Sequence, residues 1–192
     1  MRWESDASVA ATAQSAQVRA LDRFLIDVEK RAFRIARIAV RNDEDALDIV
    51  QDSMLQLARS YGKRSAEEWR PLFFRILQNR IRDCLRRSKV RSRLLAWLPH
   101  RDADNEAADP YESVPDAGPL PVEQLRTGEA MRALEQALAE LPARQQEAFM
   151  LRIFEGLDVA GTAKAMSCSE GSVKTHYSRA VHTLRERLGD VW

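Results

Sequence analysis

The chain has 192 residues, of which 45% are hydrophobic, with 30 basic residues against 29 acidic ones. This length allows one domain or two small ones with buried cores. No apolar run approaches the roughly 20 residues that cross a bilayer. The first residues also lack the apolar core of a secretion signal, so we expect a cytoplasmic protein without membrane insertion. The two cysteines are far apart and lack CxxC spacing, which disfavours both a disulfide framework and a local zinc site.

The first half of the chain is predicted to be helical after a short leader. Residues 1–17 carry no sustained apolar stripe, and we expect them to be disordered. Apolar residues spaced three and four apart then predict one helix over residues 21–39 and a second over 46–61. The second helix is expected to end near Gly62, a residue that tolerates a left-handed cap.

A third predicted helix begins at Ser65 and carries most of the basic charge. Ser65 and Glu68 have the spacing of a capping box, in which each side chain satisfies a free backbone N–H. Nine basic residues and one acid lie between Arg70 and Arg93, whereas one basic residue and seven acids lie between Arg101 and Glu123. The basic segment favours a polyanionic partner, and the neighbouring acidic segment could compete with that partner for the basic residues.

The second half of the chain begins with a predicted linker. Residues 96–125 are acidic and contain several prolines, so we expect an extended connection between two domains at 18–95 and 126–192. The second domain is expected to hold helices over 129–141 and 143–154, the latter closed by Gly156. The predicted fold class is therefore all-α, with two small helical domains joined by an acidic, proline-containing linker.

Two further helices, over 157–166 and 169–188, are divided by the short turn Ser167-Cys168. This is a helix-turn-helix arrangement, in which the second helix enters the DNA major groove. An apolar stripe on that helix comprises Val173, Tyr177, Ala180 and Leu184. Its outward residues are Ser172, Lys174, Thr175, His176, Ser178 and Arg179, which are candidates for base and phosphate contacts. A plain solvated face is the alternative interpretation.

The basic third helix is a second candidate for nucleic-acid binding. Lysine and arginine bind phosphate whatever the base sequence, although a solvated face is again possible. Asn79 and Asp83 lie among the arginines and could hydrogen-bond to base edges. Trp69 and Phe73 could stack on unpaired bases, but they fall on the apolar stripe, so we expect them in the core. Acids on the second helix favour a protein partner or a solubilising face.

Three runs of the sequence resemble a known family. They are DALDIVQDSMLQLARSY (45–61), WRPLFFRILQNRIRDCLRR (69–87) and LPARQQEAFMLRIFEGLDVAGTAKAMSCSEGSVKTHYSRAVHTLRERL (141–188). Together they are similar to a bacterial RNA polymerase sigma factor of the extracytoplasmic-function (ECF) group. Both domains of that family match in order over roughly residues 18–95 and 126–188, so the resemblance implies a two-domain, all-helical promoter-specificity subunit with no active site.

The resemblance also implies roles for individual residues. The set Asp45, Asp48, Gln51 and Asp52 would dock on the β′ clamp of core RNA polymerase. The set Asn79, Arg80, Asp83, Arg86 and Arg87 would read and hold the melted minus-ten element of promoter DNA. The outward helix-turn-helix residues, from Ser172 to Arg179, would read the minus-thirty-five element while that domain lies on the β flap. The family further implies an anti-sigma factor as a partner and no cofactor or metal.

Two other function classes remain open at this stage. A sigma mimic would keep the fold to titrate an anti-sigma factor, but it would have no use for the basic third helix or the polar recognition face. A stand-alone helix-turn-helix regulator would normally need a dimer to read two half-sites and would leave the first domain unexplained. An enzyme is disfavoured, because no Gly-rich phosphate loop or metal-ligand spacing occurs and the three histidines form no HExxH motif.

Overall fold

The computed structural model describes residues 3–95 and 121–189. All regular elements in these two stretches are helices, which confirms the predicted all-α class. In chain order they are α1 (Trp3–Val40), α2 (Asp43–Tyr61), α3 (Ala66–Leu95), α4 (Pro121–Ala139), α5 (Ala143–Ile153), α6 (Val159–Met166) and α7 (Glu170–Leu188). We call α1–α3 the N-terminal unit and α4–α7 the C-terminal unit. No described helix is both long and apolar enough to cross a bilayer.

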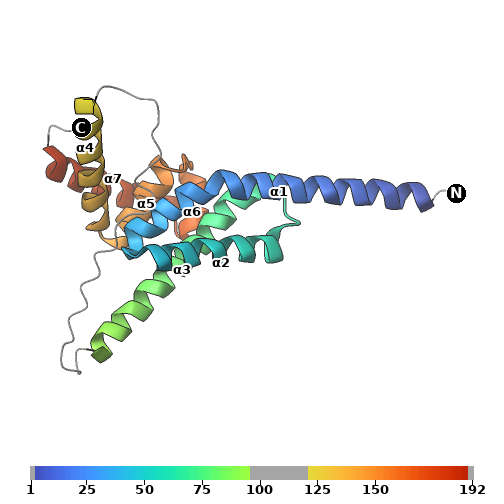
Figure 1. Ribbon diagram of the computed structural model, residues 1–192, viewed down its shortest axis with the longest axis horizontal. Helices are drawn as coiled ribbons and strands as arrows, with labels where there is room; N and C mark the ends of the chain where they lie inside the picture. Colours follow the sequence, from blue (N-terminus) through green and yellow to red (C-terminus); the bar gives the residue numbers. More distant parts are fainter. Residues whose placement is uncertain (1–2, 96–120, 190–192) are drawn as a thin grey trace.

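Helix α1 differs from the prediction at its start. The expected disordered leader is wrong over residues 3–17, because these residues form the first turns of α1, which extends beyond the other helices (Figure 1). The first 40 residues hold no glycine or proline, and the leader is rich in alanine, the strongest helix former. The later part of α1 is packed in the core and is already helical. Extending that helix backwards through an alanine-rich segment costs little free energy, because the unfavourable nucleation step has been made.

Helix α4 also starts earlier than predicted. It begins at Pro121, so the last five residues assigned to the linker are helical. Proline suits the first helical position, where its missing N–H would have no partner in any case. The remainder of the predicted linker, residues 96–120, lies outside the described residues.

The turns on either side of α2 are set by one polar side chain and a glycine. Asn42 caps α2 by accepting a hydrogen bond from the Asp45 N–H at 2.8 Å. Gly62 follows α2 in a right-handed conformation, with φ −59°, so the expected left-handed cap is wrong there. A Cβ at Gly62 would lie 3.3 Å from Leu21 of α1 and 2.7 Å from the Ala58 carbonyl, so close packing explains this glycine.

The predicted capping box at the start of α3 is half formed. The Glu68 carboxylate accepts a hydrogen bond from the Ser65 N–H at 3.4 Å, as expected. The Ser65 hydroxyl, however, donates to the same carboxylate and does not accept from the Glu68 N–H. That N–H bonds instead to the Ser65 carbonyl at 3.0 Å, so the first turn is still satisfied.

Aromatic side chains fill the core of the N-terminal unit. Trp69, Phe73 and Phe74 of α3 are all fully buried, which confirms the predicted core positions of the first two. Phe24 of α1 meets the rings of Trp69 and Phe73 at centroid distances of 5.9 and 6.1 Å. The indole N–H of Trp69 donates to the Tyr61 carbonyl at 3.2 Å, which joins the end of α2 to α3.

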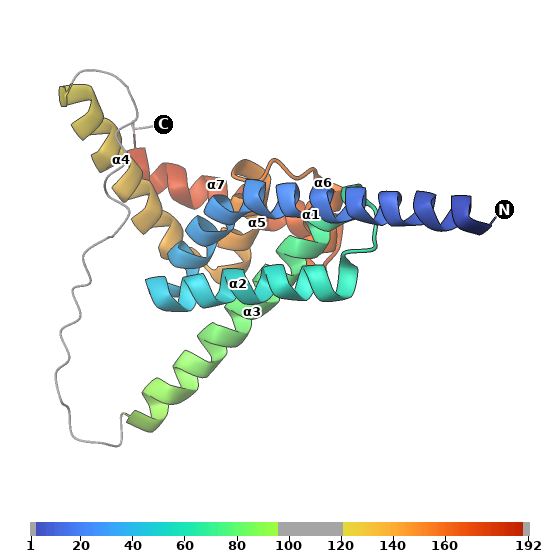
Figure 2. The ribbon, with the colours of Figure 1, turned by 45° about the vertical axis from the view of Figure 1, so that its right-hand side comes forward.

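The two units also pack against each other. Helix α3 packs along α6, and α1 contacts α4 and α5. The buried apolar residues of both units form one continuous cluster. The C-terminal half of α3, like the first turns of α1, projects away from this body (Figure 2). The sequence did not predict any contact between the units.

Candidate nucleic-acid interface

The acidic set on α2 is exposed along one side of the helix. Asp45, Asp48, Gln51 and Asp52 all face solvent, while Ala46, Ile49, Val50 and Leu57 of the same helix are buried. The acids of the first turn also complement the positive end of the helix dipole. The acidic side chains can therefore contact a partner without any change in the packing of the core.

Four of the five predicted minus-ten residues on α3 are exposed, and Arg80 is partly covered. Neighbouring arginines already use some of their polar atoms. Arg82 donates to the Asn79 side-chain oxygen at 2.7 Å, and Arg86 pairs with Asp83 at 3.1 Å. These contacts lie within one helix and are exposed, so nucleic acid can replace them at little cost.

The structure brings three residues of the acidic set (Asp45, Asp48 and Asp52) and two of the minus-ten set (Arg80 and Arg87) together in one groove. The groove lies between α2 and α3, and its lining residues are Asp45, Asp48, Ile49, Asp52, Arg80, Cys84, Arg87, Ser88 and Arg91. Arg80 pairs with Asp52 at 3.3 Å and hydrogen-bonds to Gln56 at 3.3 Å. Burial raises the pKa of the Cys84 thiol, and the nearby Asp45 carboxylate raises it further. Cys84 is therefore an ordinary half-buried thiol in this groove.

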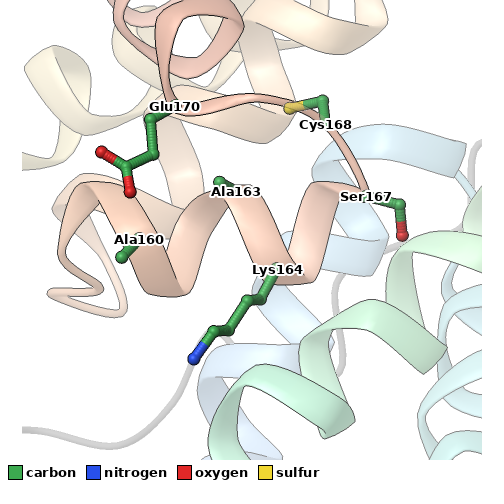
Figure 3. A pocket seen from close by; sticks show the side chains of 6 residues that line it. All are labelled: Ala160, Ala163, Lys164, Ser167, Cys168 and Glu170. Carbon is green, nitrogen blue, oxygen red and sulfur yellow. The ribbon is translucent and has the colours of Figure 1, made fainter.

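Helices α6 and α7 form the predicted helix-turn-helix. Asp158 caps α6 by accepting from the Gly161 N–H at 2.6 Å, and Ser169 caps α7 by accepting from the Ser172 N–H at 3.1 Å. Between them Ser167 takes a left-handed conformation, with φ 53°, which turns the chain sharply. A pocket at this turn is lined by Ala160, Ala163, Lys164, Ser167, Cys168 and Glu170 (Figure 3).

The two faces of α7 divide as predicted. Val173, Ala180 and Leu184 are buried, and Tyr177 stacks on Phe149 of α5 with ring centroids 6.1 Å apart. Of the six outward candidates, Lys174, Thr175, Ser178 and Arg179 are exposed, and Ser172 and His176 are half-exposed. The recognition face is therefore open to solvent in this structure.

Arg144 of α5 is a residue that the sequence reasoning missed. One of its guanidinium nitrogens donates to the Met166 carbonyl, at the end of α6, and to the Glu147 carboxylate, both at 3.0 Å. Burial raises the pKa of Glu147, and Arg144 partly opposes that shift. Arg144 thus fixes the end of α6 from which the turn to α7 starts. The three-residue spacing of Arg144 and Glu147 was the only signal in the sequence.

No group of three side chains suited to metal binding occurs among the described residues. Of the three histidines, His182 lies 3.3 Å from Glu186 on the exposed side of α7, and His100 lies outside the described residues. Both cysteines are free and half-buried.

Comparison with known proteins identifies the family. Residues 131–184 match the family described as Sigma-70, region 4. The chain is 31% identical over 157 residues to the RNA polymerase sigma-E factor of Streptomyces coelicolor, covering 81% of this chain and 78% of that protein. The chain belongs to the ECF RNA polymerase sigma factors. The ECF sigma factor SigM of Mycobacterium tuberculosis is 29% identical over 189 residues, which span 96% of this chain and 85% of SigM.

Solved structures support the fold of this sigma factor. The sigma factor RpoE of Bartonella quintana, crystallised with the anti-sigma factor NepR, matches with a TM-score of 0.63 at 22% identity. That match covers 88% of this chain and 96% of the RpoE chain. CnrH, solved with the cytosolic domain of CnrY, matches with a TM-score of 0.56 at 20% identity, covering 92% of both chains. As an RNA polymerase sigma factor, the protein acts in transcription initiation.

Proposed function

We propose that the protein binds core RNA polymerase, directs it to promoters and takes part in DNA melting, with the acidic set of α2 as its polymerase contact. The observation that carries the proposal is that a sigma-factor chain presents exposed polar side chains on three helices, two of which, α2 and α3, share a groove. These are the acids of α2, the arginines of α3 and the outward face of α7. The reaction itself takes place in the polymerase, and this subunit supplies recognition only.

The acidic set has the properties of a protein contact. Asp48 and Gln51 are exposed and close to two exposed leucines, Leu47 at 43% and Leu55 at 50% exposure. Apolar side chains among charges are typical of protein interfaces. Carboxylates next to the basic helix α3 would repel DNA phosphate, which also favours a protein partner. We assign this face to the β′ clamp of the polymerase.

The basic helix α3 has the properties of a contact to the minus-ten element. Its exposed arginines neutralise phosphates, and Asn79, Arg80, Asp83, Arg86 and Arg87 lie where side chains can also reach bases that have left the duplex. The aromatic residues Trp69 and Phe73 are buried in the core, so stacking on melted bases is not assigned to them.

The C-terminal unit is assigned to the minus-thirty-five element and to the β flap. Lys174, Thr175, Ser178 and Arg179 are exposed on the first turns of α7, the part of a recognition helix that contacts base edges. His176 and Ser172 flank them. The Ser169 cap and the N-terminal N–H groups of α7 suit a backbone phosphate.

An anti-sigma factor is the proposed regulator, because both structural relatives described above were solved with partner chains, and NepR is named as an anti-sigma factor. A cytoplasmic location follows from the same function, since promoter DNA and polymerase lie there.

The test is transcription with purified components. The protein is added to core RNA polymerase and a library of bacterial promoter fragments, and transcript start sites are sequenced. We expect start sites that depend on the protein and share two sequence elements. A chain that joins core without conferring any start site would be a mimic, and a chain that binds DNA tightly without core would be a stand-alone regulator. Either result contradicts the proposal.

A further inference from the structure

A groove between α3 and the start of α5 is lined by basic and apolar side chains. Its volume is about 400 Å³, and its lining residues are Arg82, Leu85, Arg86, Lys89 and Val90 of α3 and Ala143 of α5. No acidic residue is among these described lining residues. We call this cavity the α3–α5 groove. It shares no lining residue with the groove between α2 and α3.

The three cations of the α3–α5 groove lie on one stripe of α3. Positions 82, 86 and 89 are separated by four and three residues, so their side chains share one face over about 10 Å of helix. Arg86 and Lys89 are exposed, and Arg82 is half-buried. Like charges at this spacing on a helix repel one another. An anion in the groove therefore lowers the electrostatic energy of the folded chain.

The polar contacts within α3 leave much of this charge uncompensated. Arg82 donates hydrogen bonds to the Gln78 carbonyl at 3.1 Å and to the Asn79 side-chain oxygen at 2.7 Å, and both acceptors are neutral. Arg86 pairs with Asp83 at 3.1 Å, but the two side chains are 78% and 52% exposed, so this pair is weak. A phosphate group can therefore replace or join these contacts.

The start of α5 forms part of the groove wall. Ala143 is the first residue of this helix and is exposed, and no side chain caps the helix at Pro142. The first N–H groups of a helix have no partner within it, and the helix dipole makes this end positive. Both properties favour an anion, so the start of α5 adds to the attraction that the cations of α3 provide.

Glu147 of α5 is an acid close to these cations, but it does not line the groove. Burial raises its pKa, and Arg144 followed by Arg82 opposes that shift. The Glu147 side chain is only 4% exposed and pairs with Arg144 at 3.0 Å. A ligand in the groove would therefore meet Arg82 without contacting this carboxylate.

The lining favours a ligand that has both phosphate groups and an apolar part. Arginine and lysine bind phosphate oxygens through charge-assisted hydrogen bonds. Leu85 is half-buried and Val90 is 52% exposed, so an apolar surface lies beside the cations. The volume is in the range of sites that bind small organic ligands. A nucleotide has this combination, because it joins a charged phosphate chain to a sugar and a base with apolar faces.

We propose that the α3–α5 groove is a binding site for a nucleoside polyphosphate. The phosphates lie on Arg82, Arg86 and Lys89, and the base and sugar lie against Leu85 and Val90. This site belongs to the free chain and does not depend on the proposed function. Arg86 is also a member of the minus-ten set, so a bound nucleotide would cover one of the residues proposed to hold promoter DNA.

The experiment measures binding to the full chain by isothermal titration calorimetry at low salt. ATP is the probe, whereas adenosine and inorganic tripolyphosphate each carry one half of its chemistry. The test variant is Ala143→Asp, which places a carboxylate in the groove wall. The matched control is Ala66→Asp, at the exposed first residue of α3. An aspartate suits the first turn of a helix, so both variants should fold, and circular dichroism checks that they do.

We expect one-to-one binding of ATP to the wild-type chain and to the control. Binding to the test variant should be about tenfold or more weaker, because the new carboxylate repels the phosphates. Adenosine should not bind, and tripolyphosphate should bind about threefold or more weaker than ATP, because it has no apolar part. Absence of ATP binding, or equal binding by the two variants, overturns the proposal. Tripolyphosphate that binds as tightly as ATP also overturns it.

Nuclear magnetic resonance on the wild-type chain locates the ligand without any variant. ATP should shift the backbone amide signals of the groove, with those of Val90 and Ala143 among the largest changes. Lys89→Gln should weaken ATP binding by about threefold or more, whereas Arg91→Gln, at an exposed cation that lines the other groove, should not. Shifts centred on the other groove or on α7 would mean that ATP only mimics the DNA backbone, which overturns the proposal. A failure of the protein in transcription would instead count against the proposed function alone.

Discussion

Asp52 on α2 and Arg80 on α3 form an ion pair across the groove between these helices, with 3.3 Å between the carboxylate and guanidinium atoms. Their side chains are 56% and 38% exposed, so the pair contributes only about 0.2–1 kcal/mol to stability. An outside partner can therefore take either side chain at little cost. One groove thus holds three of the residues proposed for polymerase, Asp45, Asp48 and Asp52, and two of those proposed for DNA, Arg80 and Arg87.

The first prediction concerns the acidic set. Asp48→Ala should weaken binding to core RNA polymerase by about 1–2 kcal/mol, roughly fivefold to thirtyfold, because an exposed carboxylate at an interface is lost. The free energy of unfolding should change by less than about 0.5 kcal/mol, since Asp48 is exposed. Fluorescence anisotropy with labelled protein measures the affinity. The control is Glu29→Ala, an exposed acid on α1; equal affinities of the two variants would remove Asp48 from the interface.

The second prediction concerns the recognition helix. Arg179→Ala should weaken use of a cognate promoter by about 1–3 kcal/mol if the guanidinium contacts a base, and base preference should relax at one position of the upstream element. Run-off transcription on a set of single-base promoter variants measures both effects. Arg185→Ala, at an exposed arginine six residues further along α7, is the matched control. If both variants weaken all promoters alike, Arg179 contacts only phosphate.

Much of the architecture could be predicted because helical periodicity reports burial directly. The stripe containing Val173, Ala180 and Leu184 requires only local spacing, and all three are buried. The contact of α3 with α6 could not be predicted. Residues of α3 that pack on α6 follow the same helical spacing as those that pack within the N-terminal unit, so the spacing does not show which element buries them. Glu155 shows this limit most clearly. In the sequence it is one acid before a glycine, and only the fold places Arg31, which is 124 positions away, against it.

In the candidate site, too, the exposed residues could be predicted from the sequence, whereas their arrangement in space could not. Exposed polar faces of α2, α3 and α7 follow from their buried faces, so the candidate residues could be named from spacing. Their mutual arrangement depends on helix crossing, and the groove that joins Asp52 to Arg80 therefore appears only in three dimensions. Arg144 was missed for a related reason, since its bond to the Met166 carbonyl spans 22 positions.

The third prediction separates core packing from base stacking. Trp69→Ala should lower the free energy of unfolding by about 3–5 kcal/mol, because the ring is fully buried between α1 and α2 and its N–H bonds to Tyr61. Urea unfolding followed by circular dichroism measures the loss. Leu55→Ala, at a half-exposed leucine of α2, should cost far less. A stable Trp69→Ala protein that fails only in promoter opening would instead assign this ring to DNA.

The fourth prediction follows from the buried Glu147. Burial raises its pKa above the ordinary value of 4.5, so between that value and the raised one the folded protein holds more protons than the unfolded chain. The stability contributed at this site therefore falls as pH rises through that interval and is constant above it. Glu147→Gln keeps the shape of the side chain and cannot ionise, so it removes this pH dependence.

The measurement compares Glu147→Gln with wild type by urea unfolding at a series of pH values that starts at the ordinary value of 4.5 and rises until the difference between the two proteins stops changing. The difference in free energy of unfolding should move in favour of the variant as pH rises. Arg144 is 40% exposed, so water can solvate its guanidinium after the charge of Glu147 is lost. Glu140→Gln is the control, because the Glu140 side chain is 47% exposed and remains solvated in the folded protein. It shows the effect of removing a glutamate charge without the burial. A difference that moves toward wild type with rising pH would mean that the ion pair with Arg144 outweighs the burial cost.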